Sequence, residues 1–261
     1  MRGTMSHDAP VPVLAREDQG RVRRLILNRP AKKNALSGEL AGALVAALAE
    51  ANADPSVGAV VLASTGDMWT AGVDVNVFLQ IAEGKAPPDA LVHIARHLRA
   101  FEKPLIASVQ GPTVGMGVTI LPYFDMVYAA ERATFSTPFV HLGLVLEYGS
   151  SFTLPRLIGR QRANELVLRG KPISARTAAD WGLVTRVFAD EQLDEEVLAI
   201  ASDVASVSPG AAAACKRLLI AGEEASLAAA TAAENEALSS CYGSAENVSA
   251  VTAILNKGKR A

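Results

Sequence analysis

The sequence predicts an α/β core followed by a helical C-terminal region. Two β-branched apolar runs, Val22–Leu27 and Ala59–Ser64, have the composition of buried strands and are bounded by turn residues. The segment 37–52 between them places leucines and alanines at helical spacing. A strand, a helix and a second strand in this order are typical of α/β folds.

The same alternation continues to about residue 150. A helix over 88–101 is expected to end before Pro104, and strands follow at Leu105–Val109 and 126–129. Ser37, directly after the turn Asn34-Ala35-Leu36, is expected to cap the first helix. Beyond this point helices dominate, with predicted spans of 161–169, 174–181, 194–207, 209–221, 226–242 and 245–257.

These patterns divide the 261 residues into a flexible N-terminal segment at 1–10, a core at 11–193 and a helical region at 194–261. The last region is rich in alanine and in amphipathic helices, with little sequence to bury both helix faces within one chain. It therefore predicts self-association.

Charge and cysteine content exclude several functions. The net charge is -2, and lysine and arginine are scattered, which argues against nucleic acid or an anionic membrane as a partner. Cys215 and Cys241 are expected to be reduced thiols. Neither a signal-peptide core nor an apolar run of about 18 residues is present, so we expect a cytoplasmic protein that does not span a membrane.

Three familiar sites fit the sequence poorly. The glycines of 111–117 do not have the dinucleotide spacing, and no acidic residue is placed to bind a ribose. His93 and His97 have zinc-ligand spacing on a helix but lack a third ligand, so a solvated helix face is the better interpretation and no metal is expected. The serines at 150–151 lack the motif of a hydrolase nucleophile.

Two glycine-bearing turns offer backbone amides. In Thr70-Ala71-Gly72-Val73-Asp74 the amide of Val73 could point outward, while Asp74 is more readily explained as a cap of the following helix. In Gly115-Met116-Gly117 the Met116 amide lies at a predicted helix N-terminus, where an N–H group has no partner. Together the Val73 and Met116 amides would form an oxyanion hole.

Glu147 follows three aliphatic residues and precedes an aromatic one. Apolar surroundings would raise its pKa and make it a competent base near neutral pH. A surface glutamate in a loop before a helix explains the pattern equally well.

Read together, these segments resemble the enoyl-CoA hydratase/isomerase (crotonase) superfamily over about residues 11–257. The resemblance rests on Asn28-Arg29-Pro30, Asn34-Ala35-Leu36, Ala71-Gly72-Val73-Asp74, Lys103-Pro104-Leu105-Ile106-Ala107, Gly111 to Gly117, Leu154-Pro155-Arg156-Leu157-Ile158-Gly159 and Trp181-Gly182-Leu183-Val184. It implies a ClpP-like spiral of ββα units with a C-terminal helical trimerisation region, and hence a homotrimer or hexamer.

The same resemblance predicts the reaction. Hydratases of this superfamily use two glutamates, whose positions are Thr119 and Phe139 here. The segment Glu147-Tyr148-Gly149-Ser150-Ser151 instead resembles the peroxisomal-type 3,2-enoyl-CoA isomerases, in which one glutamate transfers the proton, although Leu146 stands where relatives often carry proline. This implies that Glu147 is catalytic and that Val73 and Met116 form the oxyanion hole.

By analogy with the family, an acyl-CoA substrate lies along the first half of the chain and no separate cofactor is needed, because coenzyme A enters with the substrate. Another crotonase reaction, or a silent acyl-CoA-binding or RNA-binding relative, is the alternative. The substrate-binding residues implied by the family, together with apolar candidates that a core role would also explain, are Lys32, Lys33, Ala71, Gly72, Asp74, Val75, Phe78, Gly115, Phe139 and Leu146.

Overall fold

A six-stranded sheet forms the centre of the computed structural model, which describes residues 11–82, 85 and 91–258. The predicted flexible segment 1–10 lies outside the described residues. The edge strand β1 (Leu14–Gln19) pairs antiparallel with β2 (Val22–Leu27), and all other neighbouring strands of this sheet are parallel. In spatial order the strands are β1 (Leu14–Gln19), β2 (Val22–Leu27), β3 (Ala59–Ser64), β4 (Leu105–Val109), β6 (Met126–Ala130) and β9 (Arg186–Phe188).

A second, three-stranded sheet is built from β5 (Thr113–Val114), β7 (Thr134–Ser136) and β8 (Ile173–Ser174). The chain passes back and forth between the sheets: β4 belongs to the large sheet, β5 to the small one, β6 to the large, β7 and β8 to the small, and β9 to the large. Isolated bridges join Leu36 to Val73 and Thr70 to Thr113, so the turn at residues 70–73 lies against the start of the small sheet.

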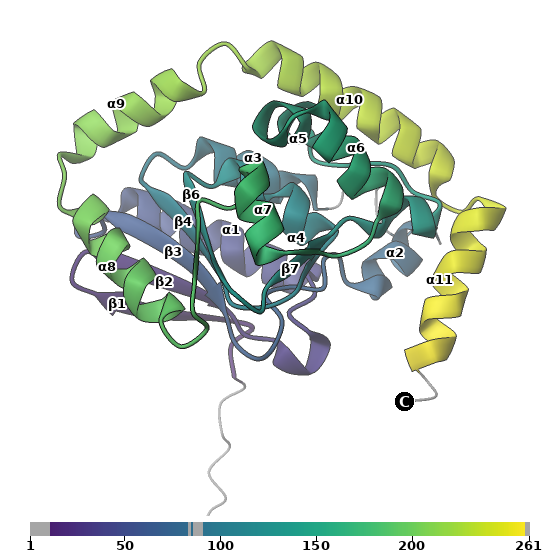
Figure 1. Ribbon diagram of the computed structural model, residues 1–261, viewed down its shortest axis with the longest axis horizontal. Coiled ribbons are helices and arrows are strands. Elements are labelled where there is room, and N and C mark those ends of the chain that lie inside the picture. Colours follow the sequence, from purple (N-terminus) through teal and green to yellow (C-terminus); the bar gives the residue numbers. More distant parts are fainter. Residues whose placement is uncertain (1–10, 83–84, 86–90, 259–261) are drawn as a thin grey trace, which may run out of the picture.

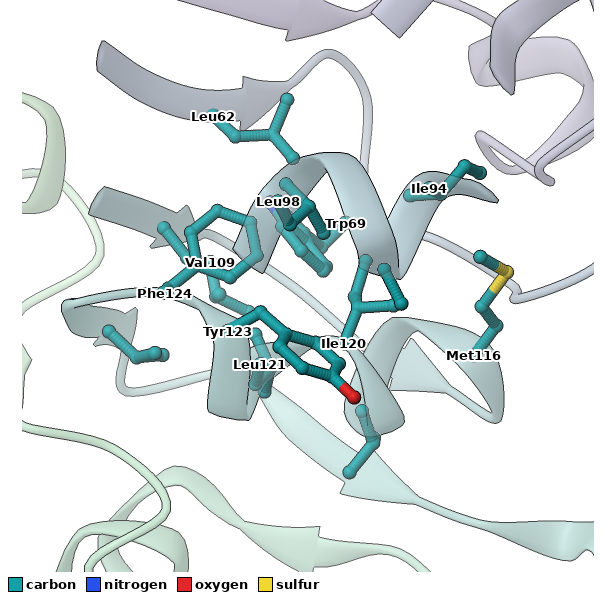
Figure 2. Close-up of a cluster of buried hydrophobic side chains, with 14 of the residues drawn as sticks. Leu62, Trp69, Ile94, Leu98, Val109, Met116, Ile120, Leu121, Tyr123 and Phe124 are labelled. Carbon is teal, nitrogen blue, oxygen red and sulfur yellow. The ribbon is translucent and has the colours of Figure 1, made fainter. Parts of the chain in front are cut away.

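Helices cover both faces of the large sheet (Figure 1). On one face, α8 (Leu193–Ala205) buries its apolar side against β2, β3, β4 and β6. On the other lies the main core, where Trp69 is fully buried and meets Phe124 edge-on with the ring centroids 6.3 Å apart (Figure 2). The helices up to α8 are α1 (Gly38–Ala53), α2 (Val75–Ala82), α3 (Val92–Ala100), α4 (Met116–Thr119), α5 (Ser150–Ile158), α6 (Arg160–Arg169), α7 (Ala175–Trp181) and α8 (Leu193–Ala205).

The last three helices, α9 (Pro209–Leu219), α10 (Glu224–Cys241) and α11 (Ala245–Gly258), form an arc around the core (Figure 1). Helix α10 packs on α5, and α11 packs on the 3-10 helix η3 (Pro138–Leu142). Helix α9 buries none of its residues, and Leu218 and Leu219 are 75% and 84% exposed.

The strands β2, β3 and β4 and the cap of α1 confirm the predictions from sequence; the Ser37 hydroxyl accepts the Leu40 amide at 3.2 Å. The sequence did not reveal β1, whose outward residues are charged as befits an edge strand, or the short strands of the small sheet. It also missed α5, because Gly149 and Pro155 favour a loop. Residues 88–90 of the helix predicted at 88–101 lie outside the described part.

Among the residues that the structure describes, no single helix is long and apolar enough to cross a membrane. Helices α8 and α9, which meet at a bend of 104°, have the length and composition of a membrane span only when taken together.

Candidate functional site

Three separate segments line a small inner cavity. The first glycine turn contributes Ala71, Gly72 and Val73, and the second contributes Val114, Gly115 and Met116. The segment from η3 to the start of α5 closes the other side with Pro138, Phe139, Leu142 and Glu147. The structure therefore brings both predicted amide turns and the predicted base to one place.

Local hydrogen bonds fix the first turn. The Thr70 hydroxyl accepts the Gly72 amide at 3.1 Å, the Gly72 carbonyl accepts the Leu36 amide at 2.7 Å, and the Asp74 amide donates to Leu36 at 3.0 Å. Gly72 has a φ of +84°, which favours glycine. Between these bonded amides, that of Val73 has no acceptor in the described part of the chain.

The second turn lies directly against the first. The Gly115 amide donates to Ser136 at 2.8 Å, and Met116, at the first position of α4, is 1% exposed. A Cβ atom on Gly72 would lie 2.7 Å from the Val114 carbonyl oxygen and 3.4 Å from the Met116 nitrogen. The Met116 amide also finds no acceptor among the described residues, so two adjacent N–H donors are left for a ligand.

Asp74 has structural partners. Its carboxylate pairs with Arg29 at 3.2 Å and accepts the Asn76 amide at 3.0 Å, at the start of α2. This agrees with the capping role that the sequence suggested for Asp74. The same residue also lines the outer groove, so its place there is compatible with the predicted contact to substrate.

Glu147 lies in a sharp turn whose next two residues, Tyr148 and Gly149, both have positive φ. Its carbonyl accepts the amide and the hydroxyl of Ser150, which fixes the turn to the start of α5. The side chain is 6% exposed, and no described atom is within hydrogen-bonding reach of its buried Oε1. Burial, and secondarily the negative charge of Glu234, raise the pKa of Glu147 to about 8.

A larger outer groove of about 610 Å³ adjoins the inner cavity, because Ala71, Val73, Val114, Pro138 and Leu142 line both. Residues between positions 32 and 144 form one wall, and α11 forms the other. The remaining residues of the groove are Lys32, Ala35, Asp74, Val75, Asn76, His141, Leu144, Ala250, Val251, Ala253 and Ile254.

Two predicted residues do not line either cavity in the described structure, and the side chain of a third is not described. Lys33 is exposed with a φ of +52°, and its carbonyl accepts the Ala71 amide at 2.9 Å. Leu146 is half-buried and packs in a cluster with Phe139. Phe78 lies on α2, but its side chain is outside the described part.

Sequence reasoning missed the groove residues of α11 and the buried carboxylate of Glu234. The α11 residues are small or aliphatic, so nothing in their type suggests a binding role. Glu234 could have been found, because it shares the buried side of α10 with Leu227 and Leu238. A carboxylate on such a stripe requires partners.

The inner cavity can perform proton transfer next to a carbonyl group. Two unpaired amides can hold a developing oxyanion, and a buried carboxylate with a raised pKa can remove a proton. Of the described lining residues, Glu147 alone carries an ionisable side chain. The side chains at positions 119 and 139 are not carboxylates: the Thr119 hydroxyl is buried and donates to Met116 at 3.2 Å, and Phe139 lines the cavity.

Comparison with known proteins agrees with this geometry. Residues 17–261 match the enoyl-CoA hydratase/isomerase family. The chain is 37% identical to human (Homo sapiens) enoyl-CoA delta isomerase 2 over 90% of its own length and 61% of that protein, so it spans about three fifths of this relative. It is 34% identical to the 2,3-dehydroadipyl-CoA hydratase of Escherichia coli (strain K12) over 92% of its length and 94% of that protein.

Among solved structures, an enoyl-CoA hydratase/isomerase from Pseudoalteromonas atlantica T6c is 38% identical. It superposes with a TM-score of 0.87, covering 94% of this chain and 97% of that one. Family, relatives and fold agree, and the chain belongs to the enoyl-CoA hydratase/isomerase family, with its crotonase fold.

Proposed function

We propose that the protein shifts the double bond of a 3-enoyl-CoA to the 2-position by proton transfer through Glu147. The observation that carries this proposal is the buried Glu147 carboxyl, whose Oε1 has no hydrogen-bond partner among the described residues. It is the single ionisable side chain among the described residues of the inner cavity, which the Val73 and Met116 amides also line. One base facing two oxyanion donors suits a reaction that moves a proton and adds no water.

The thioester acidifies the carbon next to its carbonyl, so neither a redox cofactor nor a metal is required. Glu147 takes a proton from C2, and the negative charge moves onto the thioester oxygen, which the Val73 and Met116 amides stabilise. The carboxyl then returns the proton to C4, and the double bond lies between C2 and C3. Burial of Glu147 favours this step, because it makes the carboxylate a stronger base.

The outer groove is the proposed site of the coenzyme A moiety. It opens onto the inner cavity through shared residues, and exposed Lys32 lies on its wall, where an ammonium group can meet a phosphate. The cavity itself is lined mainly by apolar side chains and backbone, as an acyl chain requires.

Hydration is the second candidate, and the similarity to a bacterial hydratase over 94% of that protein's length favours it. A two-carboxylate mechanism is disfavoured by Thr119 and Phe139. A hydratase would have to use Glu147 alone to activate water and to return the proton.

Product analysis separates the two candidates. We would incubate the purified protein with trans-3-hexenoyl-CoA and follow 2-enoyl-CoA by absorbance and mass spectrometry, with crotonyl-CoA as a parallel test of hydration. Rapid isomerisation without hydration is expected. Hydration without isomerisation would replace the proposal by the second candidate, and silence in both assays would indicate another acyl-CoA reaction or a binding role.

We also propose that the chain assembles as a homotrimer or as a hexamer made of two trimers. Helix α9 supports this, because it buries no residue within one chain and exposes Leu218 and Leu219. Sedimentation equilibrium would measure the assembly, and a monomer at micromolar concentration would contradict it.

A further inference from the structure

A second buried carboxylate stands behind the candidate base. Glu234 lies on α10, is 6% exposed, and takes no part in the chemistry proposed above. Its two oxygens are both engaged: Oε2 accepts the Gly149 amide at 2.6 Å, and Oε1 accepts the Ser151 amide at 2.7 Å. These bonds join residues more than 80 positions apart in the chain.

The geometry makes Glu234 a clamp, meaning a side chain that holds two backbone amides in place, and not a second base. Carboxylate oxygens that accept backbone amides are stabilised by charge-assisted hydrogen bonds, and a negative charge is favoured at the N-terminus of a helix, here that of the nine-residue α5. Leu227 and Leu238, buried on the same side of α10, keep this carboxylate away from solvent.

The clamped amides belong to the turn that carries Glu147. Gly149 and Ser151 follow it by two and four residues, and a Cβ atom on Gly149 would lie 2.3 Å from Leu227 Cδ1, so α10 packs directly on this turn. The Tyr123 hydroxyl also donates to the Tyr148 carbonyl. The direction in which Glu147 points is therefore set by contacts from outside its own loop.

We propose that Glu234 is a positioning residue, which holds the Glu147 turn through the Gly149 and Ser151 amides and places a second negative charge behind the base. This inference rests on the proposed role of Glu147 as the base. The negative charge of Glu234 opposes ionisation of Glu147, whose pKa is raised by burial in the first place and by this charge in the second.

The other titratable groups around Glu147 give no comparable effect. Burial, followed by the charge of Glu147, raises the pKa of Tyr242 at the end of α10, so this phenol is neutral near pH 7. Tyr123 is buried with a pKa raised to about 12. The nearby cation Arg99 is paired with Glu223 at 3.3 Å, and His141 bonds to the Arg169 carbonyl at 2.7 Å.

The test compares Glu234→Gln with Glu236→Gln, a matched change at an exposed position of the same helix. The glutamine keeps the shape but loses the charge and one acceptor. For 3-hexenoyl-CoA isomerisation by Glu234→Gln, we expect kcat at the alkaline plateau to fall about tenfold, and the acidic limb of the kcat profile to move to lower pH by about half a unit or more. Glu236→Gln should match the wild type.

Hydrogen exchange tests the clamp without activity. The amides of Gly149 and Ser151 should exchange at least about tenfold faster in Glu234→Ala than in the wild type or in Glu236→Gln. If Glu234 were only a structural clamp, Glu234→Gln would lower the alkaline plateau of kcat and Glu234→Ala would speed amide exchange, but the midpoint of the pH profile would not move. That result would overturn the electrostatic part of the proposal.

A direct titration separates this inference from the proposed function. If the wild type does not isomerise 3-enoyl-CoA, the Glu147 carboxyl can still be titrated by difference infrared spectroscopy of 13C-glutamate-labelled protein, with Glu147→Gln as the blank. A lower midpoint in Glu234→Gln would support the inference whatever the reaction. Unchanged midpoint and unchanged amide exchange would overturn it.

Discussion

The two walls of the inner cavity are built by different means. The wall formed by residues 71–73 and 114–116 offers main-chain amides, fixed by bonds within the core, and its glycines allow two turns to approach closely. The opposite wall offers one side chain, Glu147, in a turn held by the distant helix α10. The first wall depends on backbone conformation, whereas the second depends on one functional group and its surroundings.

This difference indicates where substitutions will act. A side-chain change at Val73 or Met116 leaves the amide in place, while a Cβ atom at Gly72 displaces it. On the opposite wall, a side-chain change at Glu147 removes the proposed base while the backbone conformation stays the same. The predictions below test that contrast, beginning with the largest effect.

Replacing Glu147→Gln should lower kcat for 3-hexenoyl-CoA isomerisation by at least about 10³-fold, because the amide cannot accept the proton. Glu236→Gln serves as the control. Steady-state kinetics with confirmation of folding by circular dichroism measures the effect. Retention of more than a few per cent of the wild-type rate would show that Glu147 is not the base.

The glycine wall is tested by Gly72→Ala beside Gly222→Ala. Both glycines have a φ of +84°, so both variants carry similar backbone strain, but a Cβ atom meets the Val114 carbonyl at 2.7 Å only at Gly72 and meets nothing within 4 Å at Gly222. We expect kcat to fall about 10²-fold in the first, as on removal of an oxyanion donor, and less than about twofold in the second. Equal losses in both would mean that strain, and not the amide position, matters.

The smallest expected effect is on stability. The pKa of Glu147 is raised from 4.5 to about 8 in the folded state, so between these values the native state binds a proton that the unfolded state lacks, and stability falls as the pH rises. The variant Glu147→Gln removes this pH-dependent loss of stability. We expect its free energy of unfolding to exceed that of the wild type by at least about 2 kcal/mol at pH 9, below the upper bound of about 5 kcal/mol that the full shift sets, and to differ little at pH 4.5.

Urea denaturation at the two pH values measures this difference. A gain of the same size at both would indicate improved packing and not relief from a buried charge. A lower free energy of unfolding for Glu147→Gln than for the wild type at pH 9 would show that the Glu147 carboxylate has a stabilising partner in the folded protein.

Local signals in the sequence predicted much of the core. The runs that became β3 and β4 are almost continuously apolar, and β2 carries four apolar residues beside two arginines, because helices cover both faces of the sheet. This pattern is visible in the sequence alone. The short strands β5, β7 and β8 contain two or three residues each, too few to establish a period of two. They form because the neighbouring strands place them side by side.

The sequence predicted those parts of the candidate site that each lie within one short segment of the chain. Gly72 and Gly115 mark their turns, and Glu147 stands out by its apolar neighbours. The order and spacing of these motifs indicated that they act together, through resemblance to a family. Sequence reasoning did not find Glu234 or the groove residues of α11, because their partners lie in distant parts of the chain.

Residue types and their order along the chain were enough to predict the family, and they marked the two glycine turns and Glu147 as the candidate amide donors and the candidate base. Only the folded chain shows that Glu147 is buried, that its pKa is raised and that Glu234 accepts the Gly149 and Ser151 amides. Burial and charge proximity are properties of three-dimensional neighbours, and Glu147 and Glu234 are separated by 86 intervening residues.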